Sequence, residues 1–189
     1  MNTNGLPWDR LSVIPEIVYR FTEKGCPALG KTTLQKIIYL LQGVSGKYLG
    51  YDFSLYTYGP FDSQVLQDLD FIENMKGVTI TQISGGCSGV SITPAESTDD
   101  IRNRSNLMND PIVQSRLQRL ILDFGNLSAK EMELRSTLFY VYRDSKRRNE
   151  FSTKESVVSL VQEIKPRFDI STIKSAFEEL KDKKYIEFE

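Results

Sequence analysis

Apolar residues recur three or four positions apart along most of the chain, the spacing that gathers them on one face of an α-helix. The clearest stripe follows Thr32 or Thr33, either of which is a suitable helix cap, and consists of Leu34, Ile37, Ile38, Leu41 and Val44. The same spacing predicts a helix at residues 15–24 and further helices that begin at Asp62 or Ser63, Asp110, Ser128, Ser152, and Ser171 or Thr172. Helices are therefore the main predicted elements.

Strand-like alternation is confined to four short stretches. The aromatic residues 51–58 predict a strand that closes at a Gly59-Pro60 turn. Residues 78–83 and 90–93 alternate on either side of the glycine-rich residues 84–89, which predicts a β-hairpin. Residues 185–188 predict a terminal strand.

Helices followed by a hairpin are the element order of a winged helix, in which the hairpin packs back on the helices before it. The sequence thus predicts a mainly helical α+β fold with a winged-helix-like module at residues 9–95. Residues 96–127 are predicted to connect the modules, first as an irregular segment up to residue 110 and then as a helix. A second helical, winged-helix-like module is predicted at residues 128–189.

The absence of histidine and the low number of cysteines exclude several classes of enzyme and metal site. The 189 residues include no histidine, which excludes Ser-His-Asp and Cys-His catalysis and the commonest ligand of zinc. The two cysteines, Cys26 and Cys87, are too few for a zinc tetrad. We therefore expect a cytoplasmic protein without enzymatic activity, cofactor, metal or membrane segment.

One motif argues for nucleotide binding when it is taken alone. Gly25 to Thr32 fits the G-x-x-x-x-G-K-[ST] pattern of a phosphate-binding loop. That loop requires a buried strand directly before its first glycine, whereas Thr22-Glu23-Lys24 ends a predicted helix. A nucleotide-binding protein is therefore the weakest of the alternatives.

Charge distribution also argues against the usual winged-helix recognition of DNA. The formal net charge is -1, and the segment from Asp62 to Asn74, which would enter the major groove, has four carboxylates and no Lys or Arg. The alternative to a protein-binding role is a transcriptional regulator, acting as a homodimer, that contacts nucleic acid through a cationic cluster elsewhere. The residues predicted for that contact are Arg143, Lys146, Arg147 and Arg148.

Six aromatic residues lie between Tyr48 and Phe61, more than one short strand buries on one face. If Phe53 and Leu55 point inward, Tyr56 and Tyr58 point outward. Exposed tyrosines supply the large amphipathic contacts that are typical of protein interfaces. The alternative is that a neighbouring part of the chain covers them.

Two motifs give the chain a family resemblance over about residues 10–95. The helix Lys31-Thr-Thr-Leu-Gln-Lys-Ile-Ile-Tyr-Leu40 and the turn Tyr58-Gly-Pro-Phe61 resemble those of the YwgA-like and SocA-like (Panacea) domains. Panacea domains act as antitoxins or as adaptors for a toxin partner, so the resemblance implies a protein-binding module in a toxin–antitoxin or phage-defence system. The positions that it carries over are Gln35, Lys36, Tyr39, Tyr58, Gly59 and Pro60.

Together, the motifs and the aromatic segment predict an antitoxin-like or adaptor protein whose ligand is a toxin or defence component. The partner-binding residues we predict are Gln35, Lys36, Tyr39, Tyr56, Tyr58, Gly59 and Pro60. None of them is given a catalytic role.

Overall fold

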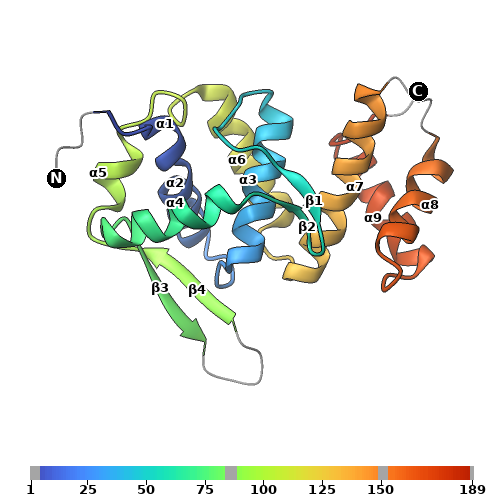
Figure 1. The fold of residues 1–189 in the computed structure, drawn as a ribbon, viewed down its shortest axis with the longest axis horizontal. Helices are drawn as coiled ribbons and strands as arrows, with labels where there is room; N and C mark the ends of the chain where they lie inside the picture. The colour runs from blue at the N-terminus through green and yellow to red at the C-terminus, as the bar shows by residue number, and fades with distance from the viewer. Residues whose placement is uncertain (1–4, 84–88, 149–152, 188–189) are drawn as a thin grey trace.

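The computed structural model describes residues 5–83, 89–148 and 153–187 and confirms a mainly helical α+β fold. Figure 1 shows the helices gathered into one elongated body, with one hairpin projecting from it and α8 and α9 beside α7 at one end. In chain order, the elements are α1 (Trp8–Leu11), α2 (Val13–Glu23), α3 (Lys31–Ser45), β1 (Ser54–Tyr56), β2 (Gly59–Phe61), α4 (Ser63–Asn74), β3 (Val78–Ile83), β4 (Gly89–Pro94), α5 (Thr98–Arg102), α6 (Pro111–Phe124), α7 (Ala129–Arg147), α8 (Lys154–Ile164) and α9 (Ile170–Asp182).

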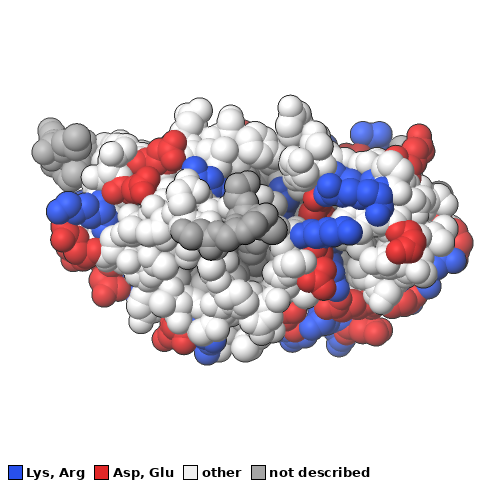
Figure 2. Space-filling model, turned by 90° about the horizontal axis from the view of Figure 1, so that it is seen from below, with Lys and Arg blue, Asp and Glu red and all other residues white. Residues whose placement is uncertain are grey.

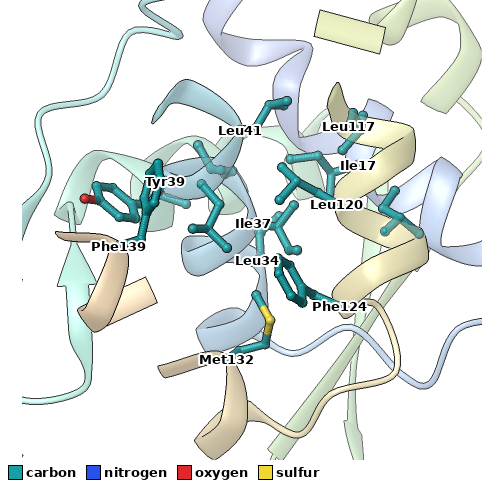
Figure 3. Close-up of a cluster of buried hydrophobic side chains, with 14 of the residues drawn as sticks. Ile17, Leu34, Ile37, Tyr39, Leu41, Leu117, Leu120, Phe124, Met132 and Phe139 are labelled. Carbon is teal, nitrogen blue, oxygen red and sulfur yellow. The ribbon is translucent and has the colours of Figure 1, made fainter. Parts of the chain in front are cut away.

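Helix α3 is the centre of the hydrophobic core. Nine consecutive residues, from Thr33 to Leu41, are buried, so this helix is enclosed on nearly every side. Helices α2, α6 and α7 all contact it. Figure 3 shows Leu34 and Ile37 of α3 beside Phe124 of α6, while Tyr39 lies beside Phe139 of α7. Burial of such large apolar side chains contributes about 1.5–3 kcal/mol each to folding.

The predicted hairpin of residues 78–93 is confirmed. Strands β3 and β4 pair antiparallel, with Val78 opposite Pro94 and Ile80 opposite Ile92. The predicted turn between them falls largely on residues 84–88, which lie outside the described residues. Ile92 also forms a single antiparallel bridge with Leu29, and the Ile92 amide donates to the Leu29 carbonyl at 2.9 Å. This bridge ties the hairpin to the segment that precedes α3.

The strand predicted at residues 51–58 is present but shorter, and its turn comes earlier than Gly59-Pro60. It is the first strand of a small hairpin, in which Leu55 of β1 pairs with Pro60 of β2 and the chain turns at Thr57 and Tyr58. Gly59, with a φ of +89°, opens β2 rather than a closing turn. Before β1 begins, the side chains of Tyr51 and Phe53 pack into the core, while Asp52 between them is exposed.

Residues 96–110 and 185–187 also differ from the predictions, because each segment contacts residues that are distant in the sequence. The polar residues 96–110 contain helix α5, which is anchored by a 2.7 Å ion pair between Arg102 and the buried Glu16 of α2. Residues 185–187, the described part of the predicted terminal strand, are not a strand. Tyr185 instead packs on Phe124, and the Glu187 backbone exchanges hydrogen bonds with the Tyr142 hydroxyl.

Helix caps confirm about half of the predicted starts. Asp62, Asp110 and Ser128 cap α4, α6 and α7, the last through a full capping box with Glu131. The other starts are displaced by a few residues: Gly30 precedes α3, Thr153 caps α8, and Asp169 precedes α9. Ser152 lies outside the described residues. Within the described ranges, no helix is both long enough and apolar enough to span a bilayer.

Candidate functional site

Gln35 and Lys36 of α3 hold the β1–β2 hairpin against the core. The Gln35 side-chain amide donates to the Asp62 carbonyl at 2.9 Å and accepts from the Asp62 amide at 3.2 Å. The Lys36 ammonium donates to the Pro60 carbonyl at 2.7 Å. Both side chains are 2% exposed. The helix motif and the turn motif, which lie 24 residues apart at Lys36 and Pro60, are therefore joined by direct hydrogen bonds.

Tyr39 occupies the next turn of the same face of α3. Its ring lies 5.3 Å from that of Phe53 and 6.0 Å from that of Phe139, both in edge-to-face geometry. Burial raises the pKa of the Tyr39 hydroxyl far above its usual range. Because the side chain is only 5% exposed, Tyr39 acts as an aromatic link between the hairpin segment and α7.

A buried cluster of charges lies beneath the hairpin. Lys165 and Glu133 are both less than 5% exposed, with the ammonium 3.1 Å from Glu133 Oε1. That contact has the distance of an ion pair but not the geometry of a hydrogen bond. Lys165 also donates to the Thr57 and Tyr56 carbonyls, and Arg167 donates to Glu133. The linker between α8 and α9 thereby fixes the turn of the hairpin.

Lys36 borders this cluster, and the charges of the cluster affect the pKa of the Lys36 ammonium. Burial lowers the pKa of Lys36 to about 8; the carboxylate of Glu133 opposes that shift and the charge of Lys165 adds to it. Three cations, Lys36, Lys165 and Arg167, thus share one buried carboxylate. Gly59 leaves room for the arrangement, since a Cβ at that position would come within 3.1 Å of the Thr137 hydroxyl.

Only two of the seven predicted partner-binding residues are at the surface. Tyr56 and Tyr58 are 66% and 59% exposed, so of the two alternatives that the sequence left open, the structure favours exposure. The tyrosine surface, which we define as these two residues, sits on the turn that Lys165 and Lys36 immobilise. The other five, Gln35, Lys36, Tyr39, Gly59 and Pro60, are buried and support the turn from beneath.

The expected acidity of α4 is smaller at the surface than its sequence indicated. Asp68 is 3% exposed, and its carboxylate binds the Arg10 guanidinium at 2.8 Å and the Tyr51 hydroxyl at 3.0 Å. Glu73 accepts from the Ile80 amide. Asp68 therefore adds little to the surface charge of α4, because a cation from α1 draws that side chain inward.

The cationic cluster of α7 divides into two groups. Arg147 and Arg148 lie within 3.6 Å and 2.9 Å of the Asp144 carboxylate. Lys146 lies over the Tyr142 ring at 5.2 Å. Arg143 instead lines a cleft together with cations from α6 and from the segment after α9.

That cleft was not predicted, because its cations come from three distant segments. We call it the cationic cleft; it has a volume of about 350 Å³. Its charged lining residues are Arg116, Arg119, Arg143, Lys183, Lys184 and Glu187. The Lys183-Lys184 pair was its one visible sign in the sequence.

The phosphate-loop alternative lacks the structural context that it needs. Helix α2, rather than a strand, leads into Gly25, and residues 25–30 form an irregular connection to α3.

Charges of both signs share the face from which the β3–β4 hairpin projects. Figure 2 shows Lys and Arg gathered toward the α7–α9 end of that face, interleaved with Asp and Glu. Mixed charges of this kind produce little net attraction for a polyanion.

No protein-family model matches the sequence, and a search among curated proteins finds no similar one.

Proposed function

We propose that the protein is a non-enzymatic interaction module that binds another protein through the tyrosine surface of the β1–β2 hairpin. The observation that carries the proposal is the combination of two large exposed side chains with a backbone fixed from beneath. Tyr56 and Tyr58 are more than half exposed, while Lys165 binds the carbonyls of Tyr56 and Thr57 and Lys36 binds that of Pro60. Preorganised aromatic anchors lose little entropy on association.

Arg167 extends the same surface. Its guanidinium lies 5.5 Å from the centre of the Tyr58 ring, a distance at which a cation is attracted to the ring face. Tyrosine and arginine are the residues most often found at the energetic centre of protein interfaces. Their proximity here favours a protein ligand.

The setting we propose comes from the resemblance to Panacea domains. Lys36 and Gly59-Pro60, which carry that resemblance, are the residues that hold the hairpin in place. A role as an antitoxin-like protein or as an adaptor for a toxin or phage-defence component fits a module that presents a rigid recognition loop. We also propose a winged-helix-like arrangement for the first half: α2, the bridging residue Leu29, α3, α4 and then the β3–β4 hairpin.

The test is co-expression with the product of the adjacent gene, followed by size-exclusion chromatography and calorimetry. A stoichiometric complex is expected, and the double substitution Tyr56→Ala with Tyr58→Ala should weaken it by at least roughly tenfold, because two anchor side chains are lost. Tyr48→Ala is the matched control, since Tyr48 is 63% exposed but lies outside the hairpin. Equal affinity of the double variant and the wild type would refute the proposal.

The second candidate is a DNA-binding regulator of winged-helix type. The hairpin β3–β4 and the cation Arg143 favour it, whereas α4 contributes no Lys or Arg to a groove. Binding to its own promoter region should then weaken steeply as salt is raised. A salt-independent result, or none, would reject this candidate.

A further inference from the structure

The cationic cleft combines a defined cavity with an excess of positive charge. Its walls come from the second half of α3, the middle of α6, the second half of α7 and the residues after α9. Gly43 and Val44 form the α3 side, and the aromatic rings of Phe139, Tyr142 and Tyr185 contribute to the rest. It is separate from the tyrosine surface and does not depend on the function proposed above.

Only part of this charge is neutralised within the protein. Asp123 accepts from Arg119 at 2.7 Å and from Lys183 at 2.8 Å. Burial would raise the pKa of Asp123, but hydrogen bonds from Lys183, Arg119 and Tyr185 lower it, so this carboxylate is charged near neutral pH. Within residues 5–83, 89–148 and 153–187, no carboxylate forms an ion pair with Arg116, Arg143 or Lys184, in contrast to Arg119 and Lys183. Arg143 does interact with the Tyr39 hydroxyl and with the Phe139 ring, but neither group carries a negative charge that would neutralise it. Counting Asp123 and Glu187 against five cations leaves three positive charges in excess.

Bringing these cations together requires a glycine inside helix α3 and a strained backbone conformation at Lys184. Gly43 allows α7 to approach α3 closely, since a Cβ there would lie 2.4 Å from the Phe139 ring and 2.8 Å from the Arg143 guanidinium. Lys184 adopts a left-handed backbone with a φ of +60°, a conformation that costs a non-glycine residue roughly 1 kcal/mol. This turn directs the chain from α9 back toward α6.

We propose that the cationic cleft binds a phosphate-bearing ligand, with Arg116, Arg143 and Lys184 as the contacting cations. Guanidinium groups match the oxygens of phosphate with paired donors, and an ammonium adds a compact charge. Three uncompensated cations suit a multiply charged phosphate better than a single carboxylate. Two kinds of ligand carry such phosphate groups: a free phosphorylated small molecule and the backbone of a nucleic-acid strand.

The experiment uses inorganic pyrophosphate and a twelve-nucleotide oligothymidylate as probes of the full chain. Calorimetry with pyrophosphate and fluorescence anisotropy with the oligonucleotide, each at two salt concentrations, should detect binding. Arg116→Gln and Arg143→Gln should each weaken it roughly tenfold, because each removes one charge-assisted contact. Much tighter binding of the oligonucleotide, with steep salt dependence, identifies a strand, and binding of pyrophosphate alone identifies a free phosphorylated molecule.

The two lysines with left-handed backbones provide a matched control. Lys184→Gly and Lys76→Gly both relieve a left-handed conformation, with φ values of +60° and +57°, and both remove one positive charge. Only Lys184 lines the cationic cleft, whereas Lys76 pairs with Glu96 beside β3. Affinity should therefore fall in Lys184→Gly and stay unchanged in Lys76→Gly. The proposal is overturned if neither probe binds the wild type at millimolar concentration, or if these two variants bind alike.

Discussion

Gly43 lies in the interior of α3, where a glycine costs about 1 kcal/mol in helix propensity relative to alanine. Its value is steric, because the Phe139 ring occupies the space that a side chain would take. Phe139 is itself 3% exposed and has little room to withdraw. The close contact between α3 and α7 therefore depends on the absence of one methyl group.

We predict that Gly43→Ala destabilises the protein by about 1–3 kcal/mol, because overpacking outweighs the gain in helix propensity. Urea denaturation followed by circular dichroism measures the change. A double-mutant cycle with Phe139→Leu provides the control, since the smaller side chain should recover part of the loss. Additive effects of the two substitutions would show that the contact is not responsible.

At the scale of elements, helix starts are governed by single side chains. The capping box of α7 is complete: the Ser128 hydroxyl accepts from the Glu131 amide at 3.3 Å, and the Ser128 amide donates to the Glu131 carboxylate at 2.8 Å. These bonds satisfy amides that the helix itself leaves without partners. Hydrogen bonds from the Ser128 hydroxyl and from the Ser128 amide to the Glu131 carboxylate lower the pKa of Glu131.

Ser128→Ala should lower the free energy of unfolding by about 1 kcal/mol, because the cap is lost while the helix remains. Chemical denaturation of the purified chain measures it. Ser128→Asp keeps a capping oxygen and should stay close to the wild type. If the alanine and aspartate variants are equally stable, the cap contributes nothing to this helix.

At the scale of the whole molecule, the buried charges beneath the hairpin connect segments that are distant in the chain. Lys36 comes from α3, Glu133 from α7 and Lys165 from the linker between α8 and α9. Removing one member of such a cluster leaves the other charges buried without a partner, which destabilises the folded state. Because Lys165 binds the turn of the hairpin, the position of the tyrosine surface depends on the linker between α8 and α9.

This cluster predicts a pH dependence of stability. The pKa of Lys36 is about 8 in the folded protein and 10.5 when unperturbed, so between these values the unfolded chain holds a proton that the folded one has released. Stability from this group therefore rises with pH, by about 1.4 kcal/mol between pH 7 and pH 9.

Urea denaturation at pH 7 and pH 9 measures this increment, which Lys36→Met should lack. Lys31→Met, at the start of the same helix and beyond the buried cluster, is the control and should keep the wild-type increment. Parallel pH profiles for the wild type and Lys36→Met would contradict the prediction.

Most helices and strands could be predicted from the sequence, but fewer of the contacts between distant segments could. Stripes such as Leu34 to Val44 and caps such as Asp110 act over a few residues, so they could be recognised locally. The aromatic residues 51–58 could not, because their alternation does not reveal that Tyr51 is drawn inward to Asp68. Likewise, the terminal residues 185–187 have a strand pattern but pack against α6 and α7.

The candidate sites divide in the same way. Alternation left open whether Tyr56 and Tyr58 are exposed or covered, and Tyr58 lies in the turn, outside strand β1. The burial of Gln35 and Lys36 could not be predicted, since both are polar residues on a helix. The cationic cleft joins Arg116 to Lys184 across 68 positions, and no local pattern links them.

By itself, the sequence determined the helical α+β class and the β3–β4 hairpin, because periodicity, caps and alternation are properties of neighbouring residues. Only the tertiary structure decided which charges are buried, which are neutralised and which gather in a cleft. Electrostatic interactions depend on distance in space and on exclusion of water, and both are settled only when the helices pack.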